Sequence, residues 1–195
     1  MITVFLITTT LFASAEHIET IILIRHAEKS IGGLGQLSCQ GFNRSLLLPS
    51  YFQKNFPVAN AIFAPDPGDK VAETEYNYAR YSYVRPLATI EPTAVALQLP
   101  VNTEIGYTNV TSLVSALVQK KYHHAVVYAV WEHQHIFLIT KALLEKFHNQ
   151  QIVPAWKNDD YSKVYVLTIH WNQHPVTIGF KITNEDLKNI STKCP

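Results

Sequence analysis

Short apolar runs alternate along this chain with longer amphipathic stretches, and this alternation limits the fold more than any other feature. Apolar runs of strand length fall at 20–25, 60–64 and 125–131, and helical patterns fill most of the intervals between them. Strands that alternate with helices form parallel sheets covered by helices on both faces. The sequence therefore predicts an α/β protein, a three-layer sandwich with a mostly parallel central sheet flanked by helices.

The remaining elements follow from periodicity and from turn residues. Helices are expected over 40–54, 86–97, 108–119 and 136–148, and an antiparallel pair of strands over 164–171 and 176–182. Ser38 is the expected N-cap of the first helix, whose apolar side is expected to carry Leu46, Leu47, Tyr51 and Phe52. Two stretches are expected to be irregular: the glycine-rich loop at 32–35, and the tyrosine-rich residues 69–84, which form either a surface flap or a lid.

Length and composition describe an ordinary globular chain. It has 195 residues, of which 47% are hydrophobic and 16% charged, enough to bury a core. The net charge of +1 excludes a broad basic surface for nucleic acid or for an anionic membrane. An anionic ligand would therefore need a local cluster of cations, and the arginines are Arg25, Arg44, Arg80 and Arg85.

The N-terminus resembles a secretory signal peptide. Its short apolar stretch ends in Ala13-Ser14-Ala15, an A-x-A cleavage pattern, although no Lys or Arg precedes it. We therefore expect a signal peptide over 1–15, one domain over 16–195, a secreted or periplasmic protein, and no stable membrane insertion after cleavage. A retained N-terminal strand or helix is the alternative.

The chain has two cysteines, Cys39 and Cys194. In an exported protein one disulfide would join the first helix to the C-terminal tail. A free, buried Cys39 is the alternative, because sequence alone does not give the distance between the two side chains. The separation does not match the spacing of a zinc site.

Basic and titratable side chains follow two of the predicted strands at the point where each strand ends. Arg25-His26 closes the first apolar run, and Glu132-His133 follows the run at 125–131. Ligands of α/β proteins bind at the carboxyl ends of the strands, so adjacent strands would bring the two histidines together. Arg85 precedes a predicted helix and can point toward the same edge.

Two histidines and two arginines around one pocket suit a phosphoryl group in transfer. Such a group has three equatorial oxygens that need positive charge, together with a nucleophile in line with the bond that breaks. The planar guanidinium matches the oxygens of an anion, and a neutral imidazole can attack phosphorus. This set of side chains predicts covalent catalysis through a phosphohistidine.

Five short motifs, in order from about residue 20 to 145, resemble those of the histidine phosphatase superfamily, also called phosphoglycerate mutase-like. Arg25-His26-Ala27-Glu28 is similar to the family's Arg-His-Gly signature, with alanine in place of glycine. The other matching segments are Leu37-Ser38-x-x-Gly41-x-x-Arg44, Ala61-Ile62-Phe63-Ala64-Pro65, Arg85-Pro-Leu-Ala-Thr-Ile-Glu-Pro-Thr93-Ala94, and His133 after its apolar strand.

Residue by residue, the resemblance implies that His26 is the phosphorylated nucleophile and that Arg25, Arg85 and His133 form the phosphate pocket. It implies a phosphatase that hydrolyses phosphomonoesters without a cofactor, on a phosphorylated small molecule or a phosphoprotein. A phosphoglycerate-type mutase is one alternative. A catalytically silent domain of the same fold, binding phosphorylated ligands or a protein, is the other.

The proton donor to the leaving group stays open among several carboxylates. Glu104 follows the arginine helix, about where many family members place their donor, and is the first candidate. Glu28 lies on the nucleophile's loop, where pairing with Lys29 is its simplest role, and Glu91 is most simply a solvated helix residue. Water or the surroundings of the leaving group are the remaining sources.

Three neighbouring features also stay open. Arg80 could replace Arg85, because the insert that precedes Arg85 is long. Arg44 either reaches the loop that carries His26 or forms surface ion pairs, and structural support is the expected role. If Glu132 touches the second histidine, its carboxylate favours that imidazole's protonated form.

A metal site is the competing interpretation of the second histidine segment. Glu132, His133 and His135 carry side chains that commonly bind zinc. No cysteine or aspartate-rich segment completes such a site, so we predict no metal.

Overall fold

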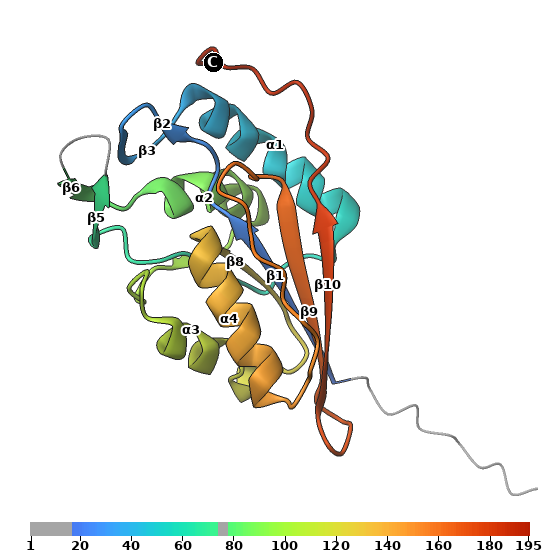
Figure 1. Ribbon diagram of the computed structural model, residues 1–195. Helices are drawn as coiled ribbons and strands as arrows, with labels where there is room; N and C mark the ends of the chain where they lie inside the picture. The colour runs from blue at the N-terminus through green and yellow to red at the C-terminus, as the bar shows by residue number, and fades with distance from the viewer. Residues whose placement is uncertain (1–16, 74–77) are drawn as a thin grey trace, which may run out of the picture.

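The computed structural model describes residues 17–73 and 78–195, and within these ranges a six-stranded sheet has the order β10-β9-β1-β8-β4-β7 (Figure 1). The strands are β1 (Ile18–Arg25), β4 (Ala61–Phe63), β7 (Val101–Asn102), β8 (Val126–Trp131), β9 (Lys163–His170) and β10 (Thr177–Asn184). Three neighbouring pairs, β1 with β8, β8 with β4 and β4 with β7, are parallel. Strand β9 runs antiparallel to both of its neighbours, β1 and β10. The predicted mostly parallel sheet is confirmed.

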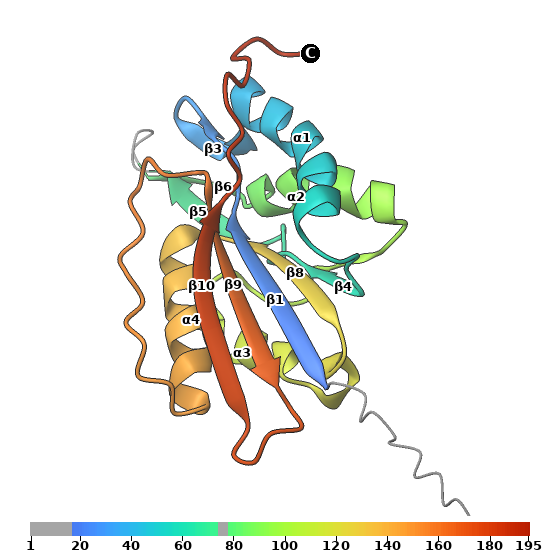
Figure 2. The ribbon, with the colours of Figure 1, turned by 90° about the vertical axis from the view of Figure 1, so that its right-hand side faces the viewer.

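Helices cover both faces of this sheet (Figure 2). On one face α1 (Cys39–Asn55) packs beside α2 (Arg85–Leu97), and on the other α3 (Val110–Leu117) packs beside α4 (His133–Lys146). A short 3-10 turn, η2 (Lys120–Tyr122), precedes β8. The arrangement is the predicted three-layer α/β sandwich.

The central strand β1 supplies side chains to both halves of the core. Ile21 and Leu23 join the cluster under α3 and α4, while Ile22 and Ile24 join the cluster under α1 and α2. Successive side chains of a strand point to opposite faces, so a central strand covered on both sides must be apolar throughout. This continuous burial holds the end of β1, and whatever follows it, in a defined position.

Helix α1 begins where the sequence predicts, but its buried side is rotated. Ser38 is the N-cap, and its Oγ accepts a hydrogen bond from the Gly41 N–H at 3.0 Å. The buried apolar residues are Leu48, Tyr51 and Phe52, whereas Leu46 and Leu47 are exposed. The prediction for Leu46 and Leu47 was wrong because positions 48, 51 and 52 share one helical face and the two leucines before them point away from it.

Two segments that were expected to be irregular are β-hairpins. β2 (Lys29–Ser30) pairs with β3 (Gly33–Leu37), and β5 (Lys70–Glu73) pairs with β6 (Ala79–Ser82). The first hairpin turns through glycines with positive φ, at 76° for Gly32 and 78° for Gly33. The hairpins lie side by side, and a Cβ at Gly35 would come within 2.0 Å of the Ser82 carbonyl oxygen.

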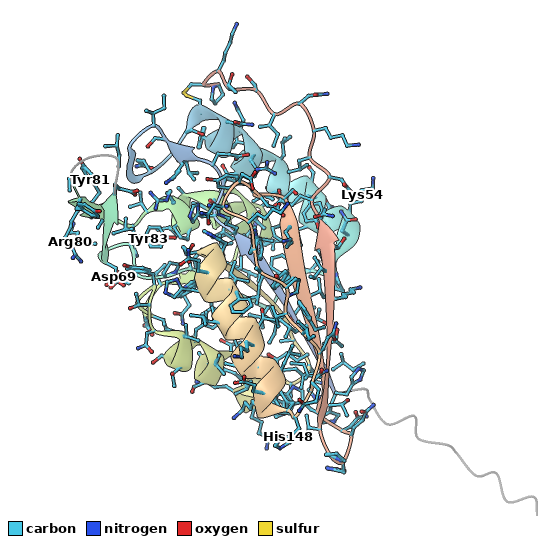
Figure 3. The ribbon with its side chains drawn as sticks, in the orientation of Figure 1. Lys54, Asp69, Arg80, Tyr81, Tyr83 and His148 are labelled. Atoms are coloured by element: carbon cyan, nitrogen blue, oxygen red, sulfur yellow. A yellow bond between two sulfur atoms is a disulfide. The ribbon has the colours of Figure 1, made fainter. Side chains whose placement is uncertain are left out.

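A disulfide joins Cys39 to Cys194, with 4.6 Å between the Cα atoms, so the open question about these cysteines is settled in favour of the bond (Figure 3). It ties the C-terminal tail to the start of α1. The Asn43 Nδ2 also donates to the Ser191 and Lys193 carbonyls, at 2.8 and 2.7 Å. The predicted signal peptide lies outside the described residues, and within them no helix is long and apolar enough to cross a membrane.

Candidate active site

The two predicted histidine segments leave the sheet at adjacent positions. Arg25 stands opposite Trp131 in the parallel pairing of β1 with β8, and the His26 N–H donates to the Trp131 carbonyl at 3.0 Å. α4 then begins at His133 instead of at residue 136, because the Glu132 side chain caps it. Glutamate is not a favoured N-cap, so this earlier start was missed.

His26 is held as a neutral imidazole with one nitrogen free. Its Nδ1 lies 2.8 Å from the Ala27 carbonyl oxygen and is therefore assigned the hydrogen, which leaves the lone pair on Nε2. The side chain is 3% exposed, and burial, followed by the charges of Arg85 and Arg25, lowers its pKa to about 3. The Ala27 N–H donates to the Thr89 Oγ1 at 2.9 Å and fixes the loop.

Arg25 lies beside this imidazole and is held by the segment that precedes β9. Its Nη1 donates to the Asn158 carbonyl at 2.6 Å and to the Asp160 carbonyl at 3.2 Å. The Tyr161 ring covers the guanidinium, with the Arg25 Cζ 3.9 Å from the ring centroid. The side chain is buried, and burial lowers its pKa, although the group stays cationic at any ordinary pH.

Arg85 is the first residue of α2, and its charge also acts on His26. Its Nη1 donates to the Glu73 Oε1 at 2.5 Å, and its Cζ lies 5.0 Å from the centroid of the Tyr83 ring. Both partners of the ion pair are buried. Arg80, the alternative cation, is exposed on β6 and donates to the Lys70 carbonyl at 3.1 Å, so the structure brings Arg85 and not Arg80 to the site.

His133 completes the buried set. Its Nε2 lies 2.7 Å from the Asn158 Oδ1, and its Nδ1 lies 2.5 Å from the Glu132 Oε1. The other Glu132 oxygen is 2.9 Å from the His135 Nδ1. Burial acts to raise the pKa of Glu132, but the bonds from His133 and His135 outweigh it and lower that pKa, so the group is a carboxylate. The expected contact between Glu132 and His133 is therefore present.

The sequence-predicted proton donors do not join this set. Glu104 is exposed beyond β7, three strands from β1, a separation of about 14 Å at the usual strand spacing. Glu28 pairs with Arg44, whose Nη2 lies 2.7 Å from its Oε1, and not with Lys29. Glu91 is exposed on α2.

Arg44 has a structural place behind the nucleophile's loop. Besides Glu28, it binds Glu185, with 2.6 Å between Nη1 and Oε2. The three side chains are largely buried and link α1, the loop after His26 and the residue after β10. Arg44 therefore reaches the loop that carries His26, the first of the two roles that the sequence left open, and does so as a buried structural support and not in a surface ion pair.

Four residues of the site were not recognised in the sequence: Glu73, Tyr83, Asn158 and Tyr161. Asn158 reaches Arg25 across 133 positions of the chain, so no local pattern marks it. Glu73 ends β5 and Tyr83 follows β6 in the tyrosine-rich stretch, and their only signal was that the stretch precedes Arg85.

Four buried polar atoms of the site have no hydrogen bond of good geometry among residues 17–73 and 78–195. They are the Nε of Arg25, the Nε of Arg85, the hydroxyl of Tyr83 and the Nδ1 of His133, which meets the Glu132 carboxylate only as an ion pair. Buried polar groups are nearly always paired, so a cluster of unpaired donors beside two guanidinium groups indicates room for an anion's oxygens. Over the same described residues, no group of three or more His, Cys, Asp or Glu side chains could hold a metal ion.

Tyr161 also lines a hollow of about 900 Å³ outside the buried set. The hollow lies between the β2–β3 hairpin, the start of α1 and the C-terminal tail, and its polar lining includes Lys29, Ser38, Gln40 and Thr192. The same ring therefore touches Arg25 on one side and this open space on the other.

No family model and no curated protein matches this chain by sequence. Its fold is similar to that of native mycobacterial glucosyl-3-phosphoglycerate phosphatase, with a TM-score of 0.55 and 14% identity over 85% of this chain and 97% of that chain. The same mycobacterial enzyme complexed with VO3 gives a TM-score of 0.52 and 13% identity over 85% and 98% of the two chains. The chain therefore has the phosphoglycerate mutase-like fold that the sequence motifs predict.

Proposed function

We propose that this protein is a phosphatase of the histidine phosphatase superfamily, which hydrolyses phosphomonoesters through a phosphohistidine on His26. One observation carries the proposal: His26 is buried and neutral with its Nε2 lone pair available, and the charges of two buried arginines with unpaired Nε donors, Arg25 and Arg85, act on it. Phosphoryl transfer requires a nucleophile together with positively charged donors that bind the phosphoryl oxygens beside it.

In the first step the His26 Nε2 attacks phosphorus, and the bond from phosphorus to the ester oxygen breaks. Arg25 and Arg85 hold the equatorial oxygens while negative charge builds on them. The Nδ1–H keeps donating to the Ala27 carbonyl, so the ring remains oriented after it gains the phosphoryl group. The departing oxygen takes a proton from water and leaves as the alcohol.

In the second step water attacks the phosphoryl group, and the nitrogen–phosphorus bond breaks. The water loses a proton, inorganic phosphate leaves, and neutral His26 is restored. The hollow beside Tyr161 is the place proposed for the alcohol part of the ester, because the Tyr161 ring that covers the Arg25 guanidinium also lines it.

The direct test compares hydrolysis of an aryl phosphate by the wild type and by His26→Asn. The matched control is His148→Asn, since His148 is exposed and has a φ of 55° that asparagine tolerates. We expect the His26 variant to lose at least about 1,000-fold in kcat, a typical cost of removing a covalent nucleophile, and the control to match the wild type. Equal rates for all three proteins would refute the proposal.

A second function, a catalytically silent domain that binds phosphorylated ligands, is favoured by one observation. Protein oxygens already contact the proposed phosphate donors: Glu73 on Arg85, and Asn158 on both Arg25 and His133. Rapid acid-free quenching with a labelled aryl phosphate distinguishes the two functions. A label on His26 supports the phosphatase, and binding without a label supports the silent domain.

We also propose that the protein is secreted or periplasmic. The signal-like residues 1–15 and the Cys39–Cys194 disulfide support this, because disulfides persist in oxidising compartments. Expression of the full chain followed by N-terminal sequencing is the test. Export with a new N-terminus near residue 16 is expected, and an intact N-terminus on a cytosolic protein would refute the proposal.

A further inference from the structure

We infer that Tyr83 is a further catalytic residue, whose phenolic O–H donates a hydrogen bond to an oxygen of the transferred phosphoryl group. The inference rests on the proposed function of the His26 site. It adds a neutral donor to the two arginines and concerns a residue that no motif in the sequence singles out.

The position of Tyr83 is fixed by its chain neighbours. It follows β6 directly and precedes Arg85 by two residues, and its N–H donates to the Asp69 carbonyl at 2.9 Å. Figure 3 shows Tyr83 on the side of the hairpin toward the sheet, while Arg80 and Tyr81 lie at its outer end. The side chain is 1% exposed, so the hairpin delivers it into the interior.

Three neighbours orient the Tyr83 ring. The His26 ring meets it edge to face, with 5.9 Å between centroids and 89° between planes. The Arg85 guanidinium lies 5.0 Å from the ring centroid, and the Tyr107 ring packs at 5.1 Å. Contact with both the nucleophile and a phosphate-binding arginine places this side chain within the reacting site.

Within the described part of the chain the phenolic hydrogen of Tyr83 has no acceptor, because the Arg85 guanidinium, which comes close enough to bond the phenolic oxygen, is itself a donor. Arginine can only donate, so even contact with the Arg85 guanidinium would leave the phenolic hydrogen without an acceptor. Thr93 and Thr140 also carry buried unpaired hydroxyls, but they lie on helices away from His26. What distinguishes Tyr83 is that the unpaired Nε atoms of two arginines share its surroundings.

The charges around the phenol define the acceptor that it lacks. Its oxygen interacts with the positive charges of Arg85 and Arg25, which favour an anionic oxygen at the same point, and with the Glu132 carboxylate, which opposes one. Burial raises the pKa of the Tyr83 phenol, even though Arg85 acts to lower it, so the group keeps its hydrogen. A phenol that stays protonated donates a hydrogen bond without transferring the proton.

Such a donor acts on the transition state. Negative charge on the equatorial oxygens is held best by donors that are already in place, in a site from which water is excluded. Removing one preorganised donor of this kind costs about 10²–10³ in kcat in enzymes where it has been measured. Tyr83 meets both conditions, because it is buried and its ring is fixed on three sides.

The test is Tyr83→Phe, which removes a single oxygen and keeps the ring contacts. We expect kcat/KM for an aryl phosphate to fall about 10- to 1,000-fold and orthovanadate to bind at least about tenfold more weakly. The thermal midpoint without ligand should be unchanged or higher, because the variant loses an unpaired buried hydroxyl. A donor that served only the fold would give the opposite combination.

The matched control is Tyr81→Phe, since Tyr81 lies on the same hairpin at its outer end and pairs with Val71. It should keep wild-type kinetics and vanadate affinity. If Tyr83→Phe keeps them as well, the inference is overturned while the phosphatase stands. If the wild type neither hydrolyses the ester nor binds vanadate, the proposed function fails, and the role of Tyr83 fails with it.

Discussion

Glu73 holds Arg85 through a 2.5 Å contact between its Oε1 and the Arg85 Nη1, with both side chains buried. The carboxylate also accepts from the Gly35 N–H at 3.3 Å. Gly33 makes room for it, because a Cβ at that position would come within 2.0 Å of the Glu73 Oε2. The hairpin β5–β6 thus places an anion on the arginine proposed to bind phosphate, and the two anions would compete.

This competition predicts the behaviour of Glu73→Gln. Removing the carboxylate charge frees Arg85 for an external anion, so orthovanadate should bind about tenfold more tightly, a gain of about 1.4 kcal/mol. The ligand-free protein should be less stable, because a buried guanidinium loses its counter-charge. Thermal melts with and without vanadate measure both effects. Glu91→Gln, an exposed site on α2, is the control; weaker vanadate binding by the Glu73 variant would contradict the competition.

The ionisation of His26 predicts how stability changes in acid. The pKa of His26 in the folded protein, about 3, lies below the ordinary value near 6.5. As the pH falls, the His26 ring is therefore protonated in the unfolded chain before it is protonated in the folded protein. The stability that neutral His26 contributes is therefore present above about pH 6.5 and is lost as the pH falls toward 3. Ring-proton NMR should show one imidazole that does not titrate between about pH 4 and 8. His26→Asn should remove that resonance, and a His26 ring that titrates near pH 6.5 would refute the prediction.

Glu19, at the opposite end of β1, predicts a pH effect of the other sign. Its Oε2 accepts from the Trp171 Nε1 at 2.9 Å, and burial raises its pKa to about 8 although that hydrogen bond acts to lower it. The folded protein binds the Glu19 proton more tightly than the unfolded chain does. The stability that the protonated Glu19 carboxyl contributes is therefore complete below about pH 4 and is lost as the pH rises through 8.

Glu19→Gln should therefore stabilise the protein at pH 8, by about 1–3 kcal/mol, and have a much smaller effect at pH 5. Urea unfolding at the two pH values measures the difference. The control is Glu145→Gln, which makes the same substitution at an exposed site on α4. An equal change at both pH values would show that the Glu19 carboxyl is not the titrating group.

The Glu28–Arg44–Glu185 cluster predicts a stability effect beside the nucleophile's loop. Arg44→Met would leave two buried carboxylates without their shared cation and should cost about 3–5 kcal/mol. The exposed Arg80→Met should change the free energy of unfolding by less than about 0.5 kcal/mol. Urea titrations of both variants test this. A loss below about 1 kcal/mol for Arg44→Met would mean that the cluster contributes little.

The local pattern of the chain was sufficient for the sheet and for the two histidine segments. β1 and β8 are continuous apolar runs, and such runs become the central strands of a covered parallel sheet for reasons that act within each segment. Since parallel strands end at the same edge, the side chains after Arg25 and Trp131 had to adjoin. The positions of Arg25, His26 and His133 therefore follow from sequence alone, and the Ser38 cap follows in the same way.

Other features needed the whole fold. Glu104 follows a two-residue edge strand that no periodicity reveals, and its distance from His26 depends on the strand order. The open choice between Arg85 and Arg80 was decided by the hairpin, which exposes one and buries the other.

The sequence by itself determined the α/β class, the central strands β1 and β8 with their shared direction, and the edge at which the Arg25-His26 and His133 segments meet. Only the tertiary structure decided what surrounds them: Glu73 on Arg85, Asn158 on Arg25 and His133, and the unpaired hydroxyl of Tyr83. The physical reason is the separation along the chain over which each interaction acts. Periodicity and capping act between residues a few positions apart, whereas burial and charge pairing at this site join segments up to 133 positions apart.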